Sequence, residues 1–183
     1  MSLARNILLA RRAINYVNDT LGVISPNQIP KTPEFLENRK QTNTKLKSLR
    51  KYINRTLDRK MKRDGITKDK SDYNIQSYKR IIPIRSAYAS KYHVGNCGEK
   101  AAIAFTRLKF LGARPIEFFS IKMLNDTHSI IVIGRISGDR LNPSTWNRDA
   151  VICDPWDNKA YPAFRYIDKI AFQGVLTFRY RYE

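Results

Sequence analysis

The chain has few of the residues from which disulfide frameworks and metal sites are built. Its 183 residues include two cysteines and two histidines. Two cysteines do not make a disulfide framework, so we expect free thiols and a reducing, cytoplasmic compartment. No C-x-x-C or H-x-x-x-H spacing occurs, and the sequence therefore predicts neither a metal site nor a cofactor.

Long apolar runs are also missing. No stretch approaches the roughly 20 residues that span a bilayer. The apolar run at 7–10 is too short for a secretory signal, and Arg11 and Arg12 interrupt it. The hydrophobic fraction of 42% supports a folded chain, and the length allows one core of ordinary size. We therefore expect a soluble protein without a transmembrane segment.

Acidic residues are scarce compared with basic ones. The chain has 34 Lys and Arg against 16 Asp and Glu, which gives a net charge of +18. The excess is concentrated near the N-terminus, since residues 1–70 hold 17 basic and 6 acidic residues and residues 71–183 hold 17 and 10. Such a charge predicts an anionic partner: nucleic acid, an anionic membrane surface or an acidic protein.

The most basic segment, residues 39–63, predicts an amphipathic helix. Its apolar residues recur every three or four positions, at Leu46, Leu49, Ile53, Leu57 and Met61. Either this helix docks by its apolar stripe and leaves a solvated cationic face, or that face contacts an anionic membrane, nucleic acid or an acidic protein. No P-loop, zinc-finger or RNP-like pattern accompanies the segment, so the nucleic-acid interpretation lacks an element that reads bases.

The remaining N-terminal sequence predicts a helix and two connecting segments. Residues 3–21 have apolar groups at helical spacing, and Gly22 is a natural stop. Three prolines mark residues 23–38 as a connector, and residues 66–77 are polar and indicate a linker. We therefore divide the chain into a basic helical extension, residues 1–75, and a core, residues 76–183.

A cysteine stands at the start of the next predicted helix. In the stretch 95–112, Asn96 is a good N-cap and Glu99 follows three residues later, which is the pattern of a capping box. Cys97 is then the first helical residue, and Gly112 is a natural stop. Backbone N–H groups and the helix dipole at such a position favour a thiolate, so the sequence predicts a reactive cysteine.

Strands follow this helix. The runs 115–121, 128–135, 150–153 and 175–182 are rich in β-branched and aromatic residues and are separated by turn residues; the run 128–135 has the pattern of a central strand. Helices followed by consecutive strands predict an α+β fold with an antiparallel sheet.

A nucleophilic cysteine needs a base, and the base needs an orienting acceptor. His128 begins one predicted strand and Asp154 follows directly from another. If these strands are neighbours, the two side chains meet at one end of the sheet, where the helix of Cys97 can point its N-terminus. Asp154 with Pro155 could also simply end a strand. Trp156 could be a core aromatic, or it could wall the site.

Three motifs in this order resemble the core of the papain-like and transglutaminase-like cysteine enzymes: G-N-C-G-E-K-A at 95–101, T-H-S-I-I-V-I at 127–133 and V-I-C-D-P-W at 151–156. The resemblance covers about residues 90–160. It implies a central cysteine-bearing helix packed on an antiparallel sheet, here preceded by the basic helices. It also implies that Cys97 is the nucleophile, His128 the base and Asp154 the orienting acid.

The resemblance leaves the second oxyanion donor open. The backbone N–H of Cys97 would supply one donor. Papain-type enzymes take the other from a glutamine six residues before the cysteine, and Lys91 stands at that position here. His93 and Asn96 are the nearby candidates.

Two functions follow as hypotheses. The first is a thiol-dependent enzyme acting on an amide or acyl bond of a protein or peptide, as a cysteine protease, a glutamine deamidase or a transglutaminase. The alternative is a non-catalytic binding module that uses residues 39–63 for an anionic partner. The resemblance extends to small bacterial effectors, which implies possible export into a host cell.

Overall fold

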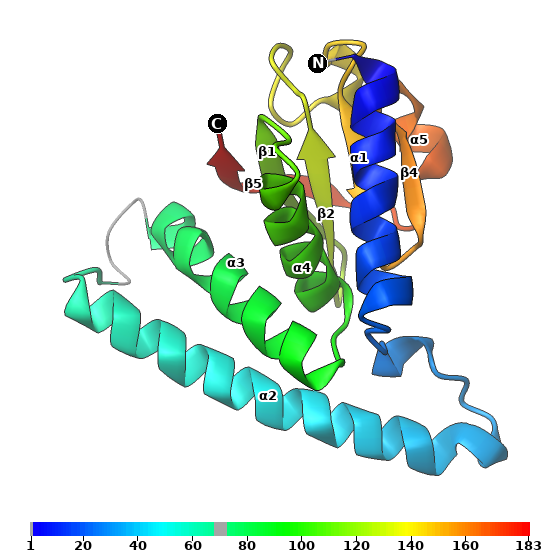
Figure 1. Cartoon of the computed structure of the whole chain (residues 1–183), viewed down its shortest axis with the longest axis vertical. Coiled ribbons are helices and arrows are strands. Elements are labelled where there is room, and N and C mark those ends of the chain that lie inside the picture. Colours follow the sequence, from blue (N-terminus) through cyan, green and yellow to red (C-terminus); the bar gives the residue numbers. More distant parts are fainter. Residues whose placement is uncertain (1, 68–72) are drawn as a thin grey trace.

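The structure, a computed structural model, describes residues 2–67 and 73–183 and has an α+β architecture (Figure 1). N-terminal helices precede a five-stranded antiparallel sheet with the strand order β4-β3-β2-β1-β5. The strands are β1 (Ile116–Lys122), β2 (Thr127–Ile133), β3 (Val151–Asp154), β4 (Lys159–Pro162) and β5 (Val175–Tyr182). The four predicted strands are confirmed, and β4 is an addition that the sequence did not predict.

Strand β2 occupies the centre of the sheet, as its sequence predicts. It pairs with β1 on one side and β3 on the other, and six of its seven residues are buried. Burial on both faces explains the unbroken apolar run at 130–133, because a strand covered on one face alone would alternate. This position places His128, near the start of β2, inside the protein and not on a solvated edge.

Helix α4 (Cys97–Phe110) packs across β2 and β1. Ala101, Ala102 and Ala104 are fully buried, since small side chains let the helix approach the sheet closely. The predicted capping box of Asn96 and Glu99 is present, and the predicted stop at Gly112 has a left-handed φ of 75°. Both ends of this helix are therefore encoded locally.

Helix α1 (Leu3–Asn15) continues as a short π-helix, Tyr16–Thr20, in good agreement with the predicted helix at 3–21. It packs beside α4 against β3 and β4 (Figure 1). Its buried residues join those of α4 and the sheet in one apolar core. The division of the chain at residue 75 remains a prediction, but α1 contributes to the same core as the cysteine helix.

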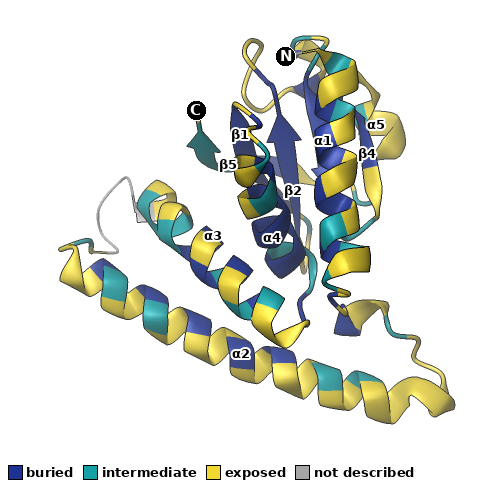
Figure 2. Cartoon of the chain, viewed as in Figure 1, coloured by how far each residue is buried: buried dark blue, intermediate teal, exposed yellow. Residues whose placement is uncertain are grey.

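Helices α2 (Leu36–Arg63) and α3 (Tyr73–Tyr92) form a layer on the outside of α4. The predicted apolar stripe of α2 is confirmed: it is buried against α3, and the opposite face is exposed (Figure 2). Part of the predicted linker at 66–77 is wrong, because residues 73–77 are the first turn of α3; residues 68–72 lie outside the described part. Helix α3 was not predicted because a proline, Pro83, interrupts its sequence. In the structure Pro83 lies within the helix, and its side chain is exposed.

The connector at 23–38 carries two short turns of 3₁₀ helix, Pro26–Gln28 and Pro33–Phe35. A last short helix, α5 (Tyr166–Lys169), lies near the other face of the sheet, where a second apolar cluster is buried. Within the described part of the chain, none of the helices combines the length and the hydropathy that a membrane crossing requires.

Candidate active site

Cys97 is the first residue of α4 and is half-buried. Its thiol lies 3.5 Å from the backbone oxygen of Thr127, the residue before His128. Gly95 makes the tight turn before the helix possible, because a Cβ at this position would collide with the Cβ of Glu99. The first N–H groups of a helix have no intrahelical acceptor, so the thiol lies at a ready-made hydrogen-bond donor site.

His128 and Asp154 meet because β2 and β3 are neighbours. His128 Nε2 lies 2.6 Å from Asp154 Oδ2, and each residue is 1% exposed. The other oxygen of Asp154 accepts hydrogen bonds from the backbone N–H groups of Trp156 and Asp157, both at 3.1 Å. The carboxylate is therefore held on both oxygens, and it fixes the orientation of the imidazole.

The same imidazole also interacts with Cys97. Burial favours the neutral ring, but hydrogen bonds to Asp154 and Cys97 outweigh it and raise the pKa of His128 to about 9. Since Nε2 is engaged by Asp154, Nδ1 is the ring atom that remains for the thiol. The structure thus brings together the three residues that the sequence singled out.

Two aromatic rings enclose His128. Trp156 and Phe172 pack edge-on against the imidazole, with centroid distances of 5.6 and 5.1 Å, and against each other at 5.3 Å. Trp156 therefore walls the site, which was one of its two predicted places. Phe172 was missed, because it stands in the loop between α5 and β5 without a sequence motif.

The second histidine of the chain, His93, does not face Cys97. His93 is exposed, has a left-handed φ of 53°, and its Nδ1 lies 2.7 Å from the backbone oxygen of Leu21. Lys91 is exposed as well, with its ammonium 5.4 Å from the ring centroid of Tyr92. Asn96 does lie beside Cys97, but its backbone N–H donates to Glu99 and its side-chain oxygen accepts from Asn27.

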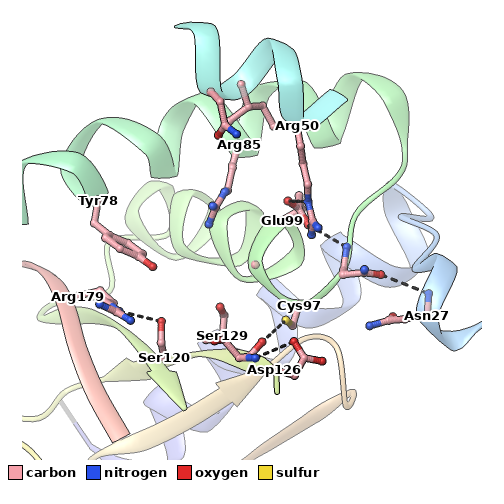
Figure 3. A pocket seen from close by; sticks show the side chains of 15 residues that line it. Asn27, Arg50, Tyr78, Arg85, Cys97, Glu99, Ser120, Asp126, Ser129 and Arg179 are labelled. Atoms are coloured by element: carbon pink, nitrogen blue, oxygen red, sulfur yellow. Dashed lines mark hydrogen bonds and ion pairs between the residues drawn. The ribbon is translucent and has the colours of Figure 1, made fainter. Parts of the chain in front are cut away.

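Asn27 is the polar residue at this site that sequence reasoning missed. It belongs to the 3₁₀ turn Pro26–Gln28, 70 residues before Cys97. Its Oδ1 accepts a hydrogen bond of 3.0 Å from the indole N–H of Trp156, so the other amide atom is the nitrogen, a donor. Figure 3 shows this nitrogen pointing toward Cys97. No sequence signal marks Asn27, because only tertiary contacts bring the connector to the helix.

Comparisons with known proteins assign no function to this site. No protein-family model matches the chain, and no curated protein and no solved structure shows significant similarity to it. Within residues 2–67 and 73–183, no group of three or more His, Cys, Asp or Glu residues is placed to hold a metal ion.

Proposed function

We propose that this chain is a thiol-dependent enzyme that uses Cys97, His128 and Asp154 on an amide or acyl bond of a protein or peptide substrate. One observation carries the proposal: a buried imidazole lies 2.6 Å from a carboxylate through Nε2, and the thiol at the start of α4, which contacts the backbone of the residue before this histidine, helps to raise the pKa of the ring. A nucleophile, a base and an orienting acceptor in one chain of contacts is the arrangement that acyl transfer requires.

The reaction begins at Cys97. Its sulfur attacks the carbonyl carbon, and His128 holds the thiol proton as an imidazolium that Asp154 stabilises. The carbonyl oxygen becomes an oxyanion, which accepts hydrogen bonds from the backbone N–H of Cys97 and the side-chain N–H of Asn27. These donors stabilise the transition state more than the ground state, because the charge on the oxygen develops only there.

The tetrahedral intermediate then collapses to a thioester. The C–N bond breaks, and His128 gives its proton to the leaving amine or ammonia. In a protease or deamidase, water attacks the thioester and His128 takes its proton; in a transglutaminase, an amine takes the place of water. The thiol is regenerated in each case.

A papain-like or transglutaminase-like core agrees with the order of the elements. In both the family pattern and this chain, a helix that begins at a cysteine precedes an antiparallel sheet with a histidine on one strand and an aspartate on the next. The basic helix α2 lies outside this common core.

The test compares wild type with Cys97→Ala in a candidate protein mixture analysed by mass spectrometry. Deamidation, cleavage or cross-links that depend on Cys97 support the proposal and separate the three chemistries. As an assay without a known substrate, alkylation of Cys97 by iodoacetamide at neutral pH should slow at least about tenfold in His128→Ala. An alkylation rate equal to that of a free thiol in both proteins contradicts the proposal.

A second candidate function rests on the exposed face of α2. Its lysines and arginines face solvent opposite the buried stripe (Figure 2), and most have no acidic partner among the described residues. This face would bind an anionic surface, and the contact could deliver the enzyme to its substrate. Salt-sensitive binding to anionic vesicles, RNA or acidic proteins that persists in Cys97→Ala would support it. Absence of binding at low salt would remove it.

Export into a host cell as a bacterial effector also remains a prediction. A translocation assay with the native chain tests it.

A further inference from the structure

A cavity of about 560 Å³ opens beside Cys97. It lies between helices α2, α3 and α4 and the strands β1, β2 and β5 (Figure 3). Cys97 and Gly98 form part of its wall. A substrate whose carbonyl lies at Cys97 therefore has room to extend into this cavity.

Three guanidinium groups line the cavity, and they differ in their partners. Arg50 is engaged by Glu99 through two hydrogen bonds of 2.9 and 2.8 Å. Arg179 donates to Ser120 at 3.1 Å, and Arg85 has no hydrogen bond within the described residues; neither has a carboxylate partner there. Neither guanidinium is therefore held by a direct ion pair among the described residues, although the charge of Arg85 acts on Glu99 and helps to lower its pKa.

The polar groups converge on the residue next to the nucleophile. A Cβ at Gly98 would lie 3.4 Å from Arg85 Nη1 and 3.9 Å from the hydroxyl of Ser129. Ser129 is 6% exposed and lines the cavity, yet its hydroxyl has no hydrogen-bond partner among the described residues. The hydroxyl is accessible from the cavity, so it is free to donate a hydrogen bond to a ligand atom there. Figure 3 shows the hydroxyl of Tyr78 pointing into the same space.

Both carboxylates of the cavity wall already accept hydrogen bonds from neighbouring groups. Glu99 is occupied by Arg50, and Asp126 accepts a hydrogen bond from the backbone N–H of Thr127 at 2.7 Å, close to Cys97 (Figure 3). Arg85 and Arg179 lie on the opposite side, on α3 and β5. The cavity therefore has a cationic end a short distance from the reacting sulfur.

We propose that this cavity binds a carboxylate of the peptide substrate, through Arg85, Arg179 and Ser129, beside the bond that Cys97 attacks. The inference rests on the proposed function and names its specificity. The planar donors of a guanidinium match the two oxygens of a carboxylate, and a hydroxyl donor completes the set. An aspartate or glutamate near the reacting carbonyl supplies this group.

Two matched probes test the pocket: N-bromoacetyl-glutamate and N-bromoacetyl-glutamine. In both, Cys97 sulfur displaces bromide from the CH₂ carbon, so a C–S bond forms, a C–Br bond breaks and the thiol proton leaves to solvent. The rate is followed by mass spectrometry of the intact protein at about physiological ionic strength, where long-range attraction is screened. Cys97→Ala corrects for reaction elsewhere.

We expect the glutamate probe to label wild type about tenfold faster than the glutamine probe. Arg85→Gln and Arg179→Gln should each bring the ratio of the two rates most of the way to one, and Ser129→Ala should lower it less. Arg55→Gln changes an exposed cation of α2 that does not line the cavity, and it should leave the ratio unchanged. Ser129→Ala also keeps the test decisive if an arginine variant fails to fold.

A wild-type ratio near one, or a ratio that all three pocket variants leave unchanged, overturns the inference. Failure of the proposed function has another signature: the glutamine probe labels wild type no faster than a free thiol, and His128→Ala has no effect. The two failures are therefore distinguishable in one set of measurements.

Discussion

Arg50, in the middle of α2, forms two hydrogen bonds with Glu99 in the first turn of α4, at 2.9 and 2.8 Å. Glu99 is 1% exposed, and it also accepts a hydrogen bond from the backbone N–H of Asn96, just before Cys97. Burial would raise the pKa of Glu99, but Arg50 outweighs this effect and lowers it. The basic helix is thereby joined to the turn that carries the candidate nucleophile.

Arg50→Ala should therefore destabilise the protein. The change leaves a buried carboxylate without its partner, which we expect to cost about 2 kcal/mol of unfolding free energy, since part of Arg50 is solvated. Urea denaturation measures it. Arg55→Ala, on the exposed face of the same helix, is the matched control and should change stability by less than about 0.5 kcal/mol. Equal effects of the two substitutions would mean that the ion pair contributes nothing specific.

The stability of the protein should fall as the pH rises through the pKa of His128. Its folded value is about 9 and its ordinary value is 6.5. Below pH 6.5 both folded and unfolded chains hold the proton, and the stabilisation is fully present. Above pH 6.5 the histidine of the unfolded chain loses its proton first. The contribution of His128 to the free energy of unfolding therefore shrinks, and it is gone above about pH 9. The total is on the order of 3 kcal/mol.

Proton NMR of the imidazole rings checks this pH dependence. The chain has two histidines, so His93→Gln assigns both ring signals. The His128 signal should titrate near pH 9, and urea denaturation should show the corresponding loss of stability. A His128 ring that titrates near 6.5 would mean that Asp154 and Cys97 do not stabilise the imidazolium.

Asn27→Asp should reduce turnover while leaving the local structure intact. Aspartate can still accept from the indole N–H of Trp156 through an oxygen, but it no longer offers a donor to the oxyanion. We expect kcat on an activated ester such as p-nitrophenyl acetate to fall about 100-fold. Alkylation of Cys97 develops no oxyanion, so its rate should change far less. A loss of alkylation as large as the loss of turnover would indicate a structural role.

Trp156→Phe should act through Asn27. Phenylalanine keeps an aromatic ring against His128 but removes the indole N–H that orients the amide of Asn27. Turnover should therefore fall, by about tenfold because the amide is loosened and not removed. In a double-mutant cycle with Asn27→Ala, the second substitution should add little. Fully additive losses would show that the two residues act independently.

Most of the sheet and the candidate triad could be predicted because their signals are local. The capping box around Cys97, the apolar run of β2 and the turn residues after Cys153 each lie within a few residues, and each predicts its element. Once two strands are neighbours, the places of His128 and Asp154 near their ends bring the side chains together. Helix α3 and strand β4 were not predicted. A proline interrupts the helical pattern of α3, and β4 has four residues, which is too short for a clear strand pattern.

The remainder of the site depends on contacts between distant segments, which leave no periodic signal. Asn27 reaches Cys97 only because the connector folds back over the start of α4, and Trp156 then fixes which end of its amide faces the thiol. Arg85 and Arg179 stand on separate elements and share a cavity only after these pack. Local sequence thus specified the candidate nucleophile, base and acid, whereas tertiary packing decided the candidate for the second oxyanion donor and the arginine-lined cavity beside them.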